Sequence, residues 1–565
     1  MGDRPARAPL VALVLGPQGA YAAGPGIDEW WPPGAVTTRF AAATREHGPR
    51  WVVWSAALGL RPIVAAGITV ARSWDLAEVH RIIHGGWPAS PGHVWAAVRG
   101  LPEREVPAPP RPRLAGFEAD LFDLPGGDDA GLLTASGQLR PDALTGWATS
   151  PERLRRLARL ALDCQAQQAV ALQHLDGVDG ARACRTAWSE SAAAVLCLEL
   201  ERDGLPVDRL AAEDLICAAA GPRPADEAAA DRTRRARDRA VLALAPGHER
   251  TDLRDPAQVR DLLAAFGVDV PNTRAQVLEP YRHGHPLVEA LLGWRKDERI
   301  ATTYGYRWLD EHVGPDDRLR GEWTACDGAA GRMTARHGLH NLPAQLRPAV
   351  RARPGHVFVR ADLGQVEPRV LAVVSGDRAL AEATRSDDLY APVARALGSD
   401  RATAKVAVLA AMYGQRSGAA GAALVQLERA YPVAMGLLDR AAAEGVAGRS
   451  VRTYGGRLIR LDGGAPGTEA ARGRYARNAV IQGSAAELFK AWAATVRVAV
   501  VPLGGQIVLC LHDELLVHVP ESGASEAAAL LDLALRSAAR TWAGTEQVRF
   551  VADTGIVRRW SDAKA

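Results

Sequence analysis

Two acidic positions interrupt strongly apolar segments of this 565-residue chain and are the first candidates for chemistry. Asp362 ends the apolar run HVFVRA, and Asp513 with Glu514 divides the run QIVLCLHDELLVHV. An ionised carboxylate in a buried strand is costly unless a cation or a partner compensates it. Each acid alone could be a solvated carboxylate at a strand-end turn, but two such positions suggest carboxylates that converge on divalent metal ions. Oxygen ligands without a nearby Cys or His cluster favour Mg²⁺ over Zn²⁺.

A basic helix is expected between the two acidic positions, over residues 401–414, RATAKVAVLAAMYG. Four of its residues recur at every fourth position and therefore share one face: Arg401, Lys405, Leu409 and Tyr413. Two cations, an apolar group and a phenol in a row could hold a triphosphate at one end and a base at the other. Taken alone, the same pattern also describes the solvated, charged edge of an ordinary helix.

Together these elements resemble the three motifs of the DNA polymerase I family, family A. Its motif A, D-Y-S-Q-I-E-L-R-V-L-A, stands here as DLGQVEPRVLA at 362–372; its motif B, R-x-x-x-K-x-x-x-[FY]-G-x-x-Y-G, is similar to 401–414; and its motif C, V-H-D-E, stands as LHDE at 511–514. The resemblance covers roughly residues 195–565. It extends to four further segments: ERDGLPVD at 201–208, HPLVEALLGWRKDERIATTY at 285–304, GRMTARHGLHNLP at 331–343 and RYARNAVIQGSAAELFK at 474–490.

The resemblance implies a DNA-templated DNA polymerase that adds dNTPs to a primer 3′-hydroxyl by two-metal-ion phosphoryl transfer, in DNA repair or replication gap filling. Asp362, Asp513 and the backbone carbonyl of Leu363 would hold two Mg²⁺ ions, for which Mn²⁺ could substitute, and Glu514 would be a secondary acid. Lys405 would also donate a proton to pyrophosphate. The residues implied around the dNTP are Arg401, Lys405, Leu409, Tyr413, Gln365, Glu367 and His512. Those implied along the primer–template DNA are Arg332, Asn341, Arg474, Asn478 and Gln482.

The chain also departs from the family pattern. Leu409 replaces the aromatic residue of motif B, and Ala410 replaces its glycine. Pro368 lies inside motif A, where it is tolerated only near the start of a helix. Tyr390 stands in place of the usual His, and the segment from Tyr390 to Arg401 is shorter than is usual, so the fingers are expected to be trimmed. These changes concern speed, fidelity and nucleotide affinity rather than the type of reaction.

The first 190 residues are expected to form an α/β exonuclease-like (RNase H-like) domain, because short apolar runs such as LVALVL at 10–15 alternate with helical stretches. Residues 65–75, AAGITVARSWD, are expected to be one of its strands. In family A this domain proofreads with four carboxylates, but residues 1–200 contain no D-x-E. We therefore predict a scaffold without proofreading. The aligned positions are Ser55 and Gly59 in place of Asn and Asp, then Arg159 with Asp163, and an isolated match at His174 and Asp179.

Residues 191–565 are expected to form an α+β right-hand polymerase, with the thumb at about 235–320, the fingers at about 376–460 and the palm in the remainder. A helix is expected to start at Pro151, and 286–312 is expected to form a long helical arm. We expect this chain to lack the separate 5′-nuclease domain of the family.

Composition places the chain among ordinary globular proteins, with 48% hydrophobic and 24% charged residues. The net charge of +3 means that any DNA-binding surface must be a local patch. The six cysteines are scattered without a C-x-x-C pair, which argues against a zinc site or a disulfide framework and suits a reducing cytoplasm. We expect a cytoplasmic, nucleoid-associated monomer. No apolar run approaches the length of a transmembrane helix.

Two other classes of protein remain open. One is a catalytically silent DNA-binding relative, and the other is a single-subunit RNA polymerase, which shares parts of the same motifs. Glu367, where the family crowds the ribose 2′-hydroxyl, and Glu514 after the motif C aspartate favour a DNA polymerase.

Overall fold

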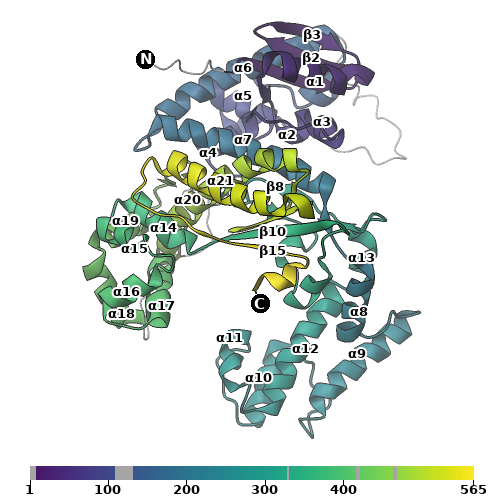
Figure 1. The fold of residues 1–565 in the computed structure, drawn as a ribbon, viewed down its shortest axis with the longest axis vertical. Helices are drawn as coiled ribbons and strands as arrows, with labels where there is room; N and C mark the ends of the chain where they lie inside the picture. Colours follow the sequence, from purple (N-terminus) through teal and green to yellow (C-terminus); the bar gives the residue numbers. More distant parts are fainter. Residues whose placement is uncertain (1–7, 109–130, 328–329, 415–419, 462–467, 565) are drawn as a thin grey trace. The chain divides into compact units, whose positions relative to one another are not determined.

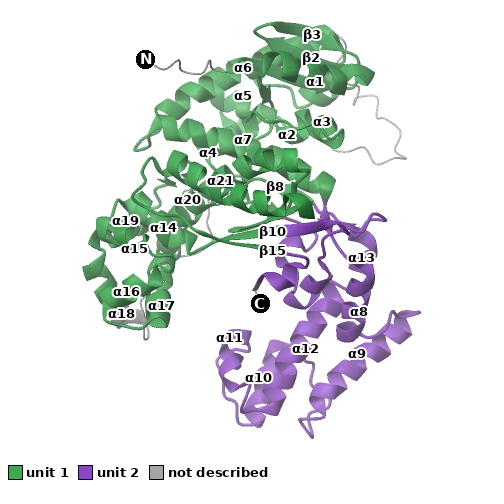
Figure 2. Ribbon diagram, in the orientation of Figure 1, with its two compact units in different colours: residues 1–203, 322–334, 359–556 green, residues 204–321, 335–358, 557–565 purple. Residues whose placement is uncertain are grey.

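The computed structural model describes residues 8–108, 131–327, 330–414, 420–461 and 468–564. The chain divides into two compact units (Figure 2). Unit 1 comprises residues 1–203, 322–334 and 359–556, and unit 2 comprises residues 204–321, 335–358 and 557–565. Both acidic positions and the basic helix belong to unit 1.

The first layer of unit 1 is a five-stranded sheet with the order β3-β2-β1-β4-β5. Its strands are β1 (Leu10–Gly16), β2 (Gly19–Gly24), β3 (Ile27–Trp31), β4 (Arg50–Val53) and β5 (Ser73–Asp75). β1 pairs antiparallel with β2 and parallel with β4, which confirms the strand predicted at LVALVL. The strand predicted over 65–75 was wrong for most of its length. A helix reaches Ala65, Gly67 takes a φ of +76°, and only the last three residues pair with β4.

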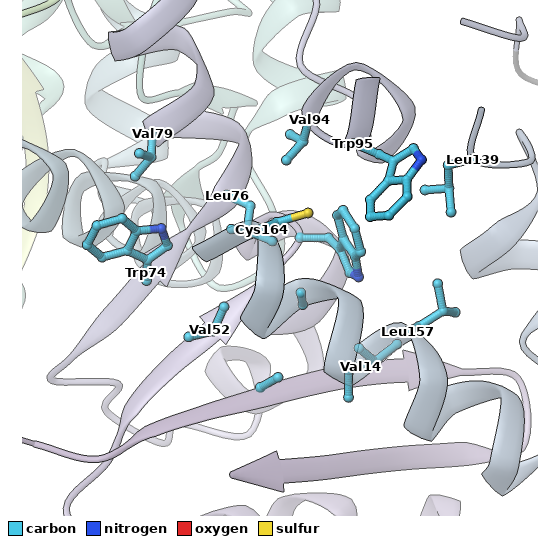
Figure 3. Close-up of a cluster of buried hydrophobic side chains, with 14 of the residues drawn as sticks. Val14, Val52, Trp74, Leu76, Val79, Val94, Trp95, Leu139, Leu157 and Cys164 are labelled. Carbon is cyan, nitrogen blue, oxygen red and sulfur yellow. The ribbon is translucent and has the colours of Figure 1, made fainter. Parts of the chain in front are cut away.

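Seven helices described in the first 203 residues accompany this sheet (Figure 1): α1 (Val36–His47), α2 (Ala56–Gly59), α3 (Arg61–Ala65), α4 (Leu76–His84), α5 (Pro91–Arg99), α6 (Pro151–Gln173) and α7 (Gly180–Asp203). α6 starts at Pro151 as predicted, with the Ser150 hydroxyl accepting a hydrogen bond from the Arg153 N–H. It packs on β1 and β2. The apolar cluster between them includes Val14, Trp95 and Leu157 (Figure 3).

The second sheet of unit 1 has the strand order β13-β14-β10-β15 and carries both acidic positions. Its strands are β10 (His356–Leu363), β13 (Gln506–Leu511), β14 (Glu514–Pro520) and β15 (Ala552–Val557). The long helix α20 (Glu469–Ala499) packs against α21 (Ala524–Ala543) and against α7. α7 continues unbroken past residue 190, where the two domains were expected to meet. One helix therefore links the first layer to the helices of the second sheet.

The helices between β10 and α20 lie together in unit 1 (Figure 1): α14 (Val366–Ser375), α15 (Arg378–Ala383), α16 (Tyr390–Leu397), α17 (Arg401–Tyr413), α18 (Ala420–Ala430) and α19 (Pro432–Val446). α17 coincides with the predicted basic helix. The short strands β8 (Trp323–Thr324), β9 (Thr334–Ala335), β11 (Val451–Arg452) and β12 (Leu458–Ile459) form two small ladders.

Unit 2 is mainly helical: α8 (Arg209–Ala220), α9 (Glu227–Leu242), α10 (Pro256–Ala265), α11 (Ala275–Leu278), α12 (Pro286–Thr303) and α13 (Tyr306–His312), with β6 (Leu205–Pro206) paired to β7 (Arg318–Leu319). The arm predicted over 286–312 is two helices, because the chain is extended at Gly305. No helix in the described part of the chain is long and apolar enough to cross a membrane.

Candidate active site

The motif C acid lies in a tight hairpin turn. Leu511 and Glu514 form the last pair of β13 and β14, so His512 and Asp513 make a two-residue turn. His512 has a φ of +48°, a conformation that costs a non-glycine residue about 1–3 kcal/mol and occurs often at functional sites. Burial raises the pKa of the Asp513 carboxyl, and the neighbouring Glu514 and Glu367 raise it further. A nearby cation would therefore stabilise the charged form of Asp513.

The motif A acid ends β10 beside that turn. The backbone N–H of Leu363 donates to the carbonyl oxygen of Asp513 at 2.9 Å, and the N–H of Gly364 donates to the carbonyl oxygen of Val551 at 2.9 Å. Asp362 precedes Leu363 directly. The structure thereby brings the two predicted catalytic aspartates onto hydrogen-bonded neighbouring segments.

A cation already lies next to Asp362. Arg360 is two residues earlier in β10, and side chains two apart in a strand share a face. Its guanidinium pairs with Asp362, with Glu514 at 3.1 Å and with Asp553 at 3.2 Å. The Arg360 side chain is 3% exposed and its partner Glu514 is buried, whereas Asp553 is exposed. Arg360 was not among the residues predicted from the sequence, although a basic residue two positions before a strand-end acid was a signal for it.

The start of α14 places Glu367 over the same region. Gln365 precedes this helix with a φ of +50°, and Pro368 falls in its first turn, as predicted for a proline in motif A. Burial raises the pKa of Glu367, while its ion pair with Arg332, at 3.2 Å, acts in the opposite direction. With its amide oxygen turned toward Arg332, Gln482 accepts from both Nη atoms at 3.2 and 2.9 Å. Arg332 thus joins Glu367 to α20.

These side chains surround a cavity of about 290 Å³. Asp513 and His512 line it from the hairpin, and Leu409 lines it from α17. Burial lowers the pKa of His512. The other predicted site residues in its wall are Arg332, Leu363, Gln365, Glu367 and Gln482, and Tyr390 also lines it. Most of the residues predicted to surround a nucleotide therefore meet at one cavity.

The remaining residues of the α17 stripe lie outside the cavity lining. Arg401, 58% exposed, makes a two-point ion pair with Asp388, at 2.6 and 3.2 Å, and this contact lowers the pKa of Asp388. Lys405 is exposed and has no ion pair with any described residue. Tyr413 is 42% exposed, and partial burial raises its pKa. Asp388 was not predicted from the sequence, where its signal was limited to an acid shortly before the basic helix.

The predicted DNA contacts divide between the two units. Arg474, Asn478 and Gln482 recur every four residues on α20, and Arg474 packs beside Gly414 at the end of α17. Asn341 belongs to unit 2, where its carbonyl oxygen accepts from Arg299 at 2.6 Å and from Tyr304 at 2.8 Å. The grouping of Asn341 with the other DNA contacts stays a prediction.

The positions aligned with exonuclease acids hold structural residues. Ser55 caps α2 by accepting from the N–H of Leu58 at 3.3 Å. A Cβ atom on Gly59 would lie 2.8 Å from Val53 Cγ1, so a larger side chain does not fit there without a shift. Asp163 is exposed on α6, and Arg159 pairs with Asp28 at 3.8 Å. His174 bonds to the backbone oxygen of Val170 at 2.9 Å.

The donor set at the turn fits magnesium. Among the described residues, no three His, Cys, Asp or Glu side chains are grouped so that they could hold a metal ion by themselves. Mg²⁺ is commonly bound by one or two carboxylates, while water and substrate phosphates complete its shell. Asp362 and Asp513 offer oxygen atoms alone, and the raised pKa of Asp513 marks a carboxylate that lacks sufficient compensation.

Two strand-end aspartates lie on hydrogen-bonded segments, and Asp513 lines a cavity that Leu409 of the basic helix also lines, an arrangement typical of a polymerase. The family model "DNA polymerase family A" matches residues 247–562, more than half of the chain. The protein belongs to this family, whose members depend on divalent metal ions generally. This result confirms the resemblance drawn from the motifs.

Individual relatives agree with this assignment. The chain is 29% identical over 325 residues to the thermostable DNA polymerase I of Thermus filiformis, covering 52% of this chain and 38% of that protein. It is 31% identical over 290 residues to DNA polymerase I of Chloroflexus aurantiacus, covering 46% and 31%. The chain thus spans well under half the length of these relatives.

One solved structure supports the fold over nearly the whole chain. The polymerase domain of Pol1 from M. smegmatis, solved with DNA primer-template and dNTP, matches with a TM-score of 0.67 at 21% identity. The match covers 98% of this chain and 96% of that one. It confirms the predicted fold class, an α/β first layer followed by an α+β polymerase.

Proposed function

We propose that this chain is a DNA-templated DNA polymerase that adds dNTPs to a primer 3′-hydroxyl, in DNA repair or replication gap filling. The observation that supports it most directly is the hydrogen bond from the Leu363 N–H to the Asp513 carbonyl oxygen, at 2.9 Å. This bond holds the ends of the two acidic motifs together at the wall of one cavity. Membership of family A and the relatives named above support the same reaction.

We propose that Asp362, Asp513 and the Leu363 carbonyl bind two Mg²⁺ ions, for which Mn²⁺ could substitute. When bound, these ions would lower the pKa of the primer 3′-hydroxyl and neutralise the leaving pyrophosphate. Arg401 and Lys405 bind the triphosphate. Arg401 must then exchange its contact with Asp388 for the phosphates, whereas Lys405 is already exposed and can donate a proton to pyrophosphate.

The cavity walls provide selectivity in this proposal. Glu367 lies under the incoming sugar and occupies the space of a ribose 2′-hydroxyl, while Leu409 contacts the sugar and base and Tyr413 covers the templating base. Gln365 and His512 border the nucleotide. Arg332 and Gln482 donate to the N3 and O2 acceptors that every base pair presents in the minor groove, so they sense geometry without reading sequence. In the same proposal, Arg474, Asn478 and Asn341 contact the primer–template DNA. Glu514 is a secondary acid beside the metal ions.

We further propose that the protein acts as a monomer in the cytoplasm, associated with the nucleoid. All six cysteines are free, which suits a reducing compartment. The first layer of unit 1 serves as a scaffold without proofreading in this proposal.

Arg360 favours one second candidate, a catalytically attenuated or silent DNA-binding relative. Its guanidinium already compensates Asp362 and Glu514, so it competes with a metal ion for the same charges. The presence of Asp362, Asp513, Arg401 and Lys405 favours the active enzyme.

Primer extension tests the proposal. The full chain is given a primed DNA template with dNTPs, and separately an unprimed template with rNTPs, in Mg²⁺ and in Mn²⁺. The proposal predicts template-directed extension with dNTPs alone. DNA binding without extension under either metal would support the silent relative, and unprimed synthesis from rNTPs would indicate an RNA polymerase.

A further inference from the structure

A second cavity in unit 1, of about 270 Å³, shares no lining residue with the cavity at the acidic turn. Three parts of unit 1 form it: the beginning of β4 with the residues just before β5, the first half of α7, and the helices α20 and α21. The exonuclease-like layer and the polymerase region therefore both contribute to its wall.

Four arginines line this cavity, and its lining contains no Asp, Glu or His: Arg50, Arg72, Arg182 and Arg185. Within the described part of the chain, none of them forms an ion pair with a carboxylate. Arg50 and Arg72 donate to the backbone oxygens of Ser73 and Gly48, at 3.0 and 3.1 Å. Burial, and secondarily the charge of Arg72, lowers the pKa of Arg50 to about 10, so it stays protonated at neutral pH. The cavity wall thus carries uncompensated positive charge.

Three buried N–H donors in the same wall have no acceptor among the described residues. They are Nε of Arg182, Nε of Arg185 and the indole Nε1 of Trp542, whose residue is 4% exposed. Buried donors are normally paired, because an unpaired one loses its hydration without replacement. The lining also contains Ser and Thr hydroxyl groups, among them the buried Thr186 Oγ1, which has no partner among the described residues. Since all the charged groups of the lining are positive, the wall matches a ligand that offers acceptors and negative charge.

An aromatic ring adjoins these cations. Trp188 lines the cavity and is 43% exposed, and the Arg50 guanidinium lies 4.7 Å from its ring centroid. The Arg182 guanidinium lies 3.6 Å from the ring of Tyr454, which fixes its position. A partly exposed aromatic ring beside several arginines is a combination that binds nucleotides by stacking and charge.

We propose that this cavity is a binding site for a nucleotide phosphate, in which Arg182 and Arg185 hold the phosphate and Trp188 stacks on the base. The volume is slightly below the roughly 300–1,000 Å³ of pockets that enclose a whole drug-sized ligand. It suits a phosphate and sugar whose base remains at the exposed Trp188 ring. The nucleotide is either free in solution or part of a single DNA strand, since both present the same phosphate chemistry.

Calorimetric titration of the full chain in EDTA tests the site without metal-dependent dNTP binding at the other cavity. The probes are ADP, inorganic pyrophosphate and a short oligo(dT). The test variant is R182Q/R185Q, and the matched control is R39Q/R449Q, which removes two exposed arginines elsewhere in unit 1. We expect ADP and pyrophosphate to bind about tenfold more weakly to the test variant, as for lost charge-assisted hydrogen bonds, and unchanged to the control.

The Trp188→Ala variant separates stacking from charge. We expect it to weaken ADP and oligo(dT) binding while pyrophosphate binding is retained. If ADP competes with oligo(dT) and binds more tightly per site, the ligand is a free nucleotide; the reverse order assigns the site to a DNA strand. Arg185→Lys keeps the charge and should retain most of the affinity if the fold is intact. The proposal would be overturned by equal binding of the probes to R182Q/R185Q and to its control, or by no binding of any probe. Preferential binding of polyglutamate, an anion without phosphate, would also overturn it.

Discussion

The guanidinium of Arg360 pairs with Asp362 on the same face of β10. Glu514 from β14 and Asp553 from β15 complete its surroundings, at 3.1 and 3.2 Å. One of the two proposed catalytic aspartates is therefore already neutralised by a fixed cation, whereas Asp513 is buried with a raised pKa. Any metal ion that binds here must share Asp362 with Arg360 or displace it.

We expect Arg360→Gln to strengthen metal binding. Removal of one nearby cation relieves its repulsion of the metal; two unit charges about 4 Å apart repel by about 4 kcal/mol at an effective dielectric constant of about 20. Titration of Mn²⁺ followed by electron paramagnetic resonance, without DNA or dNTP, measures this directly. The exposed Arg39→Gln serves as the control. Unchanged Mn²⁺ affinity would show that Arg360 does not compete for Asp362.

The same variant should lose stability when metal is absent. Glu514 is largely buried, and removal of one partner from a buried ion pair costs about 3–5 kcal/mol. Mg²⁺ should therefore raise the unfolding temperature of Arg360→Gln more than that of the unmodified protein. Scanning calorimetry with Mg²⁺ or with EDTA compares the two proteins, and equal shifts would contradict this expectation.

Asp362→Ala and Asp513→Ala should each reduce primer extension by several orders of magnitude while DNA binding survives, because metal positioning and charge neutralisation dominate phosphoryl transfer. Glu514→Ala should reduce extension less, although it also leaves Arg360 with fewer partners. Single-turnover extension and a separate DNA-binding titration distinguish the two effects. Near-normal extension by both aspartate variants would remove the site assignment.

We expect no 3′→5′ degradation of a mismatched primer in Mg²⁺ or Mn²⁺. The positions aligned with the exonuclease Asn and Asp hold Ser55 and Gly59, which cannot bind a metal ion as carboxylates do. Ser55 is engaged in capping α2, and Gly59 has little space for a side chain, since a Cβ atom there would lie 2.8 Å from Val53 Cγ1. Incubation of a labelled mismatched duplex measures the activity. Degradation that Asp163→Ala abolishes would contradict the prediction, whereas degradation that persists in that variant indicates a contaminating nuclease.

The local elements of this site were predictable because each follows from a short sequence pattern. Apolar runs located β10 and the strands β13 and β14, and the four-residue spacing located α17. The contacts were not predictable in the same way. The pairing of Arg401 with Asp388 and of Arg332 with Gln482 depends on how segments that are separate in the sequence pack together. The strand expected over 65–75 failed because its apolar pattern gave no sign that a helix would extend to Ala65, with Gly67 turning the chain.

Glu367→Ala should raise the incorporation of rNTPs relative to dNTPs. Glu367 lines the cavity at the turn and is 15% exposed, so its removal opens the space that a 2′-hydroxyl needs. It also frees Arg332, whose contact with Gln482 should keep the arginine in place. Competition between a dNTP and its rNTP on one template gives the ratio, and an unchanged ratio would mean that Glu367 does not contact the sugar.

Leu409 should limit nucleotide affinity. Its side chain lines the cavity of about 290 Å³ together with Tyr390 and Glu367, at the place where family A presents an aromatic ring. Stacking of a base on an aromatic ring is worth about 1–3 kcal/mol, and leucine retains part of the apolar contact. We therefore expect Leu409→Phe to gain about 1 kcal/mol, which corresponds to roughly a fivefold lower KM for dNTP.

The cavity itself decides whether this gain is realised. Leu409 is only partly buried on α17, and the space in front of it is open in the structure, so a ring can enter without displacing α17. Tyr390 lines the same cavity and opposes this gain. A second large ring beside it can overfill the site, which typically costs about 1–3 kcal/mol of stability. Primer extension with dNTP and ddNTP compares Leu409, Phe and Tyr at this position, and Leu409→Tyr should also ease ddNTP use through its hydroxyl. A poorer KM for Leu409→Phe that Tyr390→Ala restores would assign the loss to crowding. A poorer or unchanged KM in both backgrounds, in proteins that fold, would show that Leu409 does not face the sugar.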